Sequence, residues 1–169
     1  DDGHVYAVDG TIDHYNAFWA LVNAGVTTRA QYEKLLGRNE NGSLNPAYIK
    51  YLDDDNLIDY MLIVFFTGAP DMPLGGTNRL RNLYAMVNRV SSTGWKYLVH
   101  DNEGSMAQNE GVTYDRVIVV PSATLNTQEN FNPWSLHLKL KANPEYLITF
   151  ADRVHKHFFN GGALTPAAN

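Results

Sequence analysis

Apolar side chains recur every three or four residues in the first part of the chain. In TIDHYNAFWALVNAG this spacing predicts a helix that Thr11 caps and Gly25 stops. In the next segment Thr27 or Thr28 is expected to cap a second helix, RAQYEKLLG. A third and shorter helix, PAYIKYL, is predicted from Pro46, because proline suits the first helical turn.

The longest apolar run, NLIDYMLIVFF, follows three consecutive aspartates, Asp53 to Asp55. It is apolar on nearly all sides, which predicts a central, buried helix. Three carboxylates suit a helix N-terminus, because its first N–H groups are unpaired and its dipole is positive there. A calcium loop also uses clustered aspartates, but the glycine and the distal glutamate of an EF-hand are missing. A helix cap is the favoured interpretation and an ion site the alternative.

A loop rich in glycine and proline, TGAPDMPLGGTN, carries the chain from Thr67 to Asn78 and displays Asp71. The runs NLYAMVNRV and WKYLVHD, joined by SSTG, then predict a β-hairpin. Near the end of the chain, PWSLHLKLKANPEYLITFADRVHKHFF predicts two helices broken at Asn143-Pro144. The whole pattern predicts one α+β domain over residues 1–169, mainly helical, with a small hairpin packed on a central helix.

Composition excludes several classes of function. The chain has no cysteine, which rules out disulfides, thiolate zinc sites and a cysteine nucleophile. The net charge is −5 and no basic stripe occurs, so nucleic acid is not expected as a partner. No apolar run reaches the roughly 18 residues that a membrane span needs. The chain begins at Asp1 without a signal-peptide pattern, and we expect it to be a processed or excised piece of a longer protein.

Three polar residues follow one another in an order that suggests phosphoryl transfer. This chemistry needs a carboxylate near the attacking hydroxyl, and oxygen ligands that hold magnesium against the nucleotide phosphates. Protein kinases supply them from an aspartate, an asparagine a few residues later, and a second aspartate beyond a pair of strands. Asp71, Asn78 and Asp101 occur in this order at comparable spacing. Because such residues are also common in ordinary loops, the spacing alone is a weak signal.

Longer stretches carry a resemblance to a known family. The segments YLDDDNLIDYMLIVFFTGAPD and WKYLVHDNEGS, with the tail NPEYLITFADRVHKHFFNGGALTP, resemble the CotH kinase-like family of bacterial spore-coat and surface proteins. The resemblance implies the C-terminal lobe of an atypical protein kinase, with most of the N-terminal lobe absent. It also implies ATP and magnesium as cofactors, and phosphoryl transfer to serine or threonine of a secreted, surface or coat protein.

The same resemblance assigns roles to individual residues. Asp71 matches the catalytic aspartate of the family's Gly-Asn-x-Asp element. Asn78 matches the downstream asparagine, and Asp101 the metal-binding aspartate, so both are expected to hold nucleotide and magnesium. Glu103 lies in the same acidic turn and is expected to assist as a metal ligand.

Other positions depart from the family pattern, which keeps a second interpretation open. The departing residues are Ala69 and Pro70 before Asp71, Arg79 in place of an aromatic residue, and His100 in place of a tryptophan. No glycine-rich phosphate loop occurs either, so this chain alone is expected to bind ATP poorly and to transfer phosphate slowly or not at all. The alternative is a pseudokinase-like surface or binding module without catalysis.

Three further motifs favour structural roles. His155 and His157 are two residues apart, whereas a zinc pair on a helix needs a spacing of three or four. Ser105 lacks the Gly-x-Ser-x-Gly element of a hydrolase. Trp134, which follows Pro133, is expected to be a packing anchor.

Overall fold

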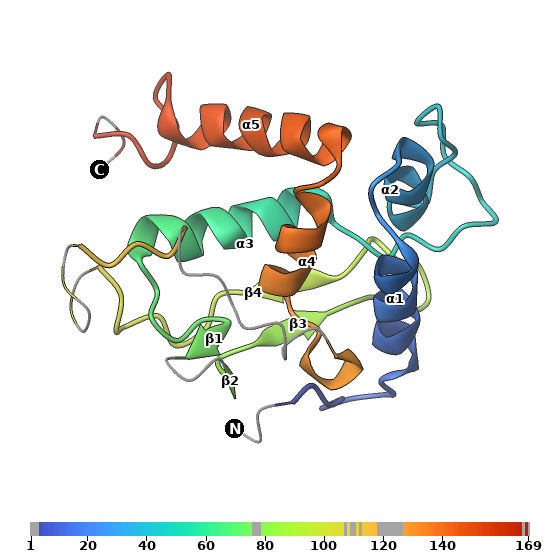
Figure 1. Ribbon diagram of the computed structural model, residues 1–169, viewed down its shortest axis with the longest axis horizontal. Helices are drawn as coiled ribbons and strands as arrows, with labels where there is room; N and C mark the ends of the chain where they lie inside the picture. The colour runs from blue at the N-terminus through green and yellow to red at the C-terminus, as the bar shows by residue number, and fades with distance from the viewer. Residues whose placement is uncertain are drawn as a thin grey trace.

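A computed structural model describes residues 4–75, 79–106, 108, 111, 113–117, 127–166 and 168. Within these residues the protein is an α+β domain built around helix α3, Asp54–Thr67, as the sequence predicts. Figure 1 shows α3 across the centre, with α5 above it and the β-strands below. One side of α3 carries the exposed residues Asp55 and Phe66, and the buried side chains of the helix are Leu57, Ile58, Tyr60, Met61, Leu62 and Val64.

The three aspartates at the start of α3 act as a cap and as side-chain anchors. Asp53 accepts a hydrogen bond from the backbone N–H of Asn56 at 3.1 Å and pairs with Lys96. Asp54 accepts one from the Tyr32 hydroxyl at 2.6 Å. Asp55 pairs with Arg153, and in the described ranges no group of three or more acidic or histidine side chains could hold a metal ion. The cap interpretation is confirmed, and the three carboxylates of the ion-site alternative are engaged by protein partners.

Two helices precede α3. Helix α1 spans Asp13–Ala24 and ends at Gly25, as predicted, but Ile12 is its N-cap and no side chain caps it, so the predicted Thr11 cap is wrong. Helix α2 spans Arg29–Leu35 and begins with a capping box between Thr28 and Gln31.

The helix predicted from Pro46 does not form. The side chain of Asn45 accepts a hydrogen bond from the N–H of Ala47, which closes a turn at this point. The N–H groups of Tyr51 and Leu52 donate across to the carbonyl oxygen of Leu35, at 2.8 and 2.9 Å. Because these donors are used in tertiary contacts, they are not available for a local helix.

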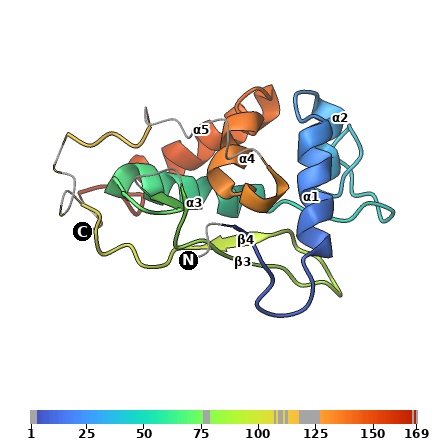
Figure 2. The ribbon, with the colours of Figure 1, turned by 60° about the horizontal axis from the view of Figure 1, so that its bottom comes forward.

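Two small antiparallel sheets lie below α3. In the first, β1 (Leu74–Gly75) pairs with β2 (Arg79–Leu80). In the second, β3 (Tyr84–Met86) pairs with β4 (Lys96–Leu98), which confirms the predicted hairpin with shorter strands. Figure 2 shows this hairpin between α3 and the segment that begins the chain. The hairpin packs on α3 as predicted, and buried Tyr97 is its main contact residue.

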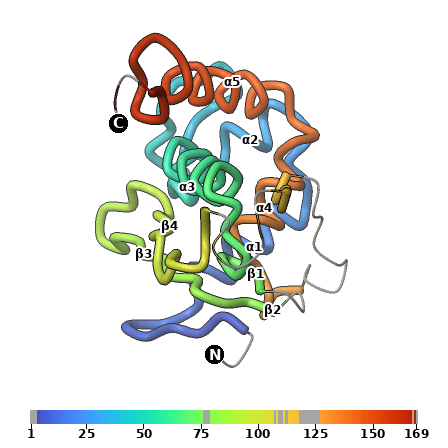
Figure 3. Tube along the Cα trace, turned by 90° about the vertical axis from the view of Figure 1, so that its left-hand side faces the viewer, coloured from blue at the N-terminus to red at the C-terminus, as the bar shows by residue number. Residues whose placement is uncertain are grey.

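The last part of the chain forms a 3₁₀ turn and two helices: η2 (Gln128–Asn130), α4 (Pro133–Leu140) and α5 (Pro144–Phe158). The predicted break at Asn143-Pro144 is confirmed. The side chain of Asn143 caps α5 and also donates to the carbonyl oxygens of Val26 and Thr28, at 2.9 and 3.0 Å. Both α4 and α5 pack on α3, which Figure 3 shows nearly end-on.

Candidate functional site

The loop that carries Asp71 starts at the C-terminus of α3. Gly68 has a left-handed conformation there (φ 60°), and its N–H closes the helix on Phe65 and Val64. Ala69 and Pro70 are buried, whereas Asp71 is half-buried. Leu74 then enters β1 and is buried again. The loop is therefore held by apolar anchors on both sides of Asp71.

A buried arginine, Arg116, is hydrogen-bonded to the C-terminal end of this loop. Arg116 is only 4% exposed, and its Nη2 donates to the carbonyl oxygen of Leu74 at 3.2 Å. Its Nη1 donates to the Tyr114 hydroxyl at 3.1 Å, and its guanidinium lies 4.4 Å from the ring centre of Trp134. The prediction that Trp134 is a packing anchor is confirmed, since it is 2% exposed. The role of Arg116 was missed, because two of its partners, Leu74 and Trp134, are remote in sequence.

The acidic turn follows β4 and returns to the end of α3. Asp101 and Glu103 are exposed, and Asp101 has a left-handed backbone (φ 55°). Just beyond, the N–H of Met106 donates to the carbonyl oxygen of Thr67 at 2.6 Å, and the amide of Asn102 donates to the Thr67 hydroxyl at 3.4 Å. Thr67 is the last residue of α3, four positions before Asp71. The hairpin thus brings the acidic turn back to the base of the Asp71 loop.

Two residues that sequence reasoning missed lie at the same end of the hairpin. The paired register ends at Tyr84 and Leu98, so Arg81 and Asn82 lie before the first residue of β3, and His100 and Asp101 lie after the last residue of β4. The ring centres of Tyr84 and His100 are 4.4 Å apart. Asn82 is left-handed (φ 51°), as Asp101 is. Left-handed backbone is uncommon at residues other than glycine and occurs at functional sites.

The structure describes three of the four predicted site residues, Asp71, Asp101 and Glu103. Asn78 belongs to the stretch 76–78, outside the described residues. Asp71 is half-buried, and Asp101 and Glu103 lie together in one exposed turn. Within the described part of the chain, these side chains do not belong to any cluster of three or more acidic or histidine residues suited to a metal. The acidic turn therefore offers two carboxylates, which are free of ion pairs among the described residues.

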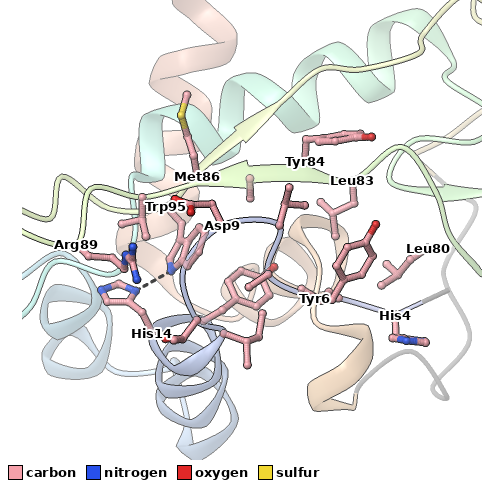
Figure 4. Close-up of a pocket in the computed structure, with 18 of the residues that line it drawn as sticks. His4, Tyr6, Asp9, His14, Leu80, Leu83, Tyr84, Met86, Arg89 and Trp95 are labelled. Atoms are coloured by element: carbon pink, nitrogen blue, oxygen red, sulfur yellow. Dashed lines mark hydrogen bonds between the residues drawn. The ribbon is translucent and has the colours of Figure 1, made fainter. Parts of the chain in front are cut away.

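A groove of about 590 Å³ lies beside the hairpin, between β3 and the segment that begins the chain (Figure 4). Eight consecutive residues, from Leu80 to Val87, line it, and Arg81 is one of them. Because strand side chains alternate between faces, a consecutive run indicates that the edge of β3 faces the groove. The opposite edge of the hairpin is covered, since the Asn56 amide exchanges two hydrogen bonds with the backbone of Tyr97.

His14, at one end of the groove, is held in one tautomer and in its neutral form. The indole N–H of Trp95 donates to Nδ1 of His14 at 3.0 Å. Burial, assisted by the charge of Arg89, lowers the pKa of His14. The ring is therefore neutral near pH 7, and its proton resides on Nε2, because Nδ1 acts as acceptor.

Comparison of the chain with protein-family models, with curated proteins and with solved structures gives no match. The proposed function therefore rests on the positions and contacts of this chain's own residues. No helix in the described ranges has the length and apolar character to cross a membrane.

Proposed function

We propose that the chain is the C-terminal lobe of a CotH-like phosphotransferase, which uses magnesium and ATP to phosphorylate serine or threonine of a coat or surface protein. One observation carries the proposal. The two hydrogen bonds to Thr67 join the turn with Asp101 and Glu103 to the base of the loop with Asp71. A base and a metal-binding turn, 30 residues apart in sequence, therefore start from one helix end, as phosphoryl transfer needs.

The acidic turn fits magnesium. This ion keeps several waters and is usually bound by one or two carboxylates together with substrate phosphates, so it does not need a complete protein cage. Asp101 and Glu103 supply two exposed carboxylates that form no ion pair among the described residues. In the proposed enzyme they would hold the metal, which neutralises phosphate charge when bound, and Asn78 would contribute its amide oxygen.

Asp71 is the proposed base, and Arg81 adds a cation to the site. Its backbone N–H donates to the carbonyl oxygen of Pro73 at 3.0 Å, which ties it to the Asp71 loop. Its side chain packs against Gly75, where a Cβ would come within 2.5 Å of Arg81 Cδ. Arg81 is exposed and has no acidic partner in the described ranges, so its charge is available to phosphate oxygens.

Calorimetry tests this proposal. Titration with ATP should give weak binding that needs magnesium and is lost in Asp101→Asn. The matched control is Asp152→Asn, which removes an exposed carboxylate from α5 and should leave the heat unchanged. Equal heats for wild type and Asp101→Asn would show that the acidic turn does not take part in nucleotide binding, and would contradict the proposal. With γ-labelled ATP, Asp71→Asn should keep binding and abolish the slow transfer.

A binding module without catalysis is the second candidate. It is supported by the residues before Asp71, because Ala69 and Pro70 are both buried and apolar. No polar side chain therefore stands beside Asp71 at the family's asparagine position. Binding of magnesium and ATP with no transfer to any protein substrate, by wild type and Asp71→Asn alike, would favour this candidate.

A further inference from the structure

The end of the groove formed by His14 and Arg89 has hydrogen-bond donors without acceptors. Nε2 of His14 carries the proton of the neutral ring, is buried, and has no partner among the described residues. A buried donor left unpaired costs on the order of 1–3 kcal/mol. In a structure where most buried polar groups are paired, such a donor marks a place that an acceptor can fill.

Arg89 brings a positive charge to the same place. Figure 4 shows its guanidinium beside the His14 ring, and its charge contributes to the lowered pKa of that ring. The guanidinium lies over Gly10, where a Cβ would be 2.4 Å from Nη1. Within the described ranges Arg89 has no ion pair, although Asp9 lines the same groove. Arg89 is exposed, so its charge is available to an anionic ligand.

We propose that Arg89 and His14 form an anion-binding subsite, and that the groove takes a small organic acid. The carboxylate or phosphate of this ligand accepts hydrogen bonds from the Arg89 guanidinium, and from the buried Nε2–H of His14 once the exposed Arg89 side chain beside the ring moves to uncover it. Its apolar part lies along β3. Arg81 lines the other part of this groove, but the subsite uses none of the carboxylates of the acidic turn and does not depend on the phosphotransferase proposal.

The walls of the groove explain why the ligand has an apolar part. Tyr6 is 64% exposed and Val8 84% exposed on the wall formed by the segment that begins the chain, and half-buried Leu83 lies on the hairpin side, as Figure 4 shows. Large apolar side chains that stay exposed around one groove are typical of a binding site. A ligand body placed between them removes this surface from water, which favours binding by roughly 25 cal/mol for each Å² buried.

Four probes test the ligand class by NMR titration of the ¹⁵N-labelled chain. Phenylacetate and phenyl phosphate carry the apolar part with a carboxylate or a phosphate, and the tighter of the two identifies the anion. Phenylacetamide lacks the charge, and inorganic phosphate lacks the apolar part. Both organic anions should shift the Nε2–H signal of His14 and bind at least about fivefold more tightly than either control. Equal binding of phenylacetamide, or of inorganic phosphate, would overturn the proposal.

Variants test the residues. Arg89→Gln should weaken binding of the better anion about tenfold, and His14→Phe, which keeps an aromatic ring, about fivefold. Asp9→Asn should strengthen it about twofold, because a nearby negative charge is removed. The matched control, Lys156→Gln, removes one exposed charge from α5 and should have no effect. Unchanged affinity in Arg89→Gln, with the wild-type thermal midpoint, would show that Arg89 does not bind the anion and would overturn the proposal.

The two proposals can fail separately. Asp101→Asn should abolish binding of magnesium and ATP and leave binding of phenyl phosphate unchanged. Arg89→Gln should do the reverse. Loss of ATP binding in Arg89→Gln would instead show that the groove is part of the nucleotide site, which overturns a separate subsite and leaves the phosphotransferase proposal standing.

Discussion

Arg153 of α5 forms a bidentate ion pair with the carboxylate of Asp59, in the middle of α3. Nε donates to Oδ1 at 2.8 Å and Nη2 pairs with Oδ2, while Nη1 reaches Asp55 at 3.3 Å. Asp59 holds the pKa of Arg153 above its usual value. The arginine side chain is only 14% exposed. Together with His157, whose Nε2 lies 3.0 Å from Oδ1 of Asp59, Arg153 joins the long C-terminal helix to the central one.

Replacing Arg153 with alanine should destabilise the protein by about 1–3 kcal/mol, because the half-buried Asp59 loses a bidentate partner. Urea unfolding measures the change. Lys156→Ala, on the same helix but exposed and without an ion pair among the described residues, should change the free energy of unfolding by less than about 0.5 kcal/mol. Equal effects of the two substitutions would show that the Asp59 contact contributes little.

His137 should make stability depend on pH. Its Nδ1 lies 2.7 Å from the Tyr146 hydroxyl, and burial lowers its pKa to about 4. In the unfolded chain the pKa is about 6.5, so between these values the unfolded state binds more protons. Stability is therefore expected to fall as the pH falls from about 6.5 to about 4, by on the order of 2–3 kcal/mol.

The pH dependence can be assigned by substitution. His137→Gln should lower stability at pH 7 and flatten the profile between pH 4 and 6.5. His155→Gln, an exposed histidine on α5, should leave the slope of the profile as it is. A wild-type slope in His137→Gln, measured by urea unfolding across this range, would contradict the assignment.

Arg116→Met should loosen the Asp71 loop. The substitution keeps an unbranched side chain against Trp134 but removes the donors to Leu74 and Tyr114. We expect a loss of about 2–3 kcal/mol in stability, since a buried carbonyl oxygen is left without its partner. Amide exchange at Leu74 and Gly75 should also become faster. Arg116→Lys should restore little, because an ammonium cannot reproduce the planar arrangement of donors. Full rescue by lysine would show that only the charge matters.

Asn56 should be necessary for the hairpin. Its amide nitrogen donates to the carbonyl oxygen of Tyr97 at 3.2 Å, and its oxygen accepts from the N–H of Tyr97 at 2.6 Å. Asn56→Ala should cost about 1–3 kcal/mol. Asn56→Asp keeps the acceptor and should cost less at neutral pH. Asn88→Ala, which removes only turn hydrogen bonds to Val90 and Ser91, is the control and should be milder. If aspartate were as damaging as alanine, the acceptor bond would not matter.

Much of the fold could be predicted because its signals are local. The Thr28 cap satisfies an N–H three residues away, and Gly25 ends α1 at the predicted place. Asn143 was recognised only through the proline that follows it. Its contacts with Val26 and Thr28 span more than one hundred residues, and no sequence spacing indicates them. The helix expected from Pro46 fails for the same reason, since Leu35 uses the N–H groups that the helix needs.

By itself the sequence determined where α1 to α5 and the β3–β4 hairpin form, although not that the segment from Pro46 stays non-helical, because caps, turns and apolar periodicity act within a few residues. It also placed Asp101 and Glu103 in one turn. Only the tertiary structure decided which distant groups meet: Thr67 with Met106, Arg116 with Leu74, and Trp95 with His14. Such contacts depend on how packed helices and strands bring remote segments together, and a hydrogen bond between atoms 81 residues apart leaves no periodic trace in the chain.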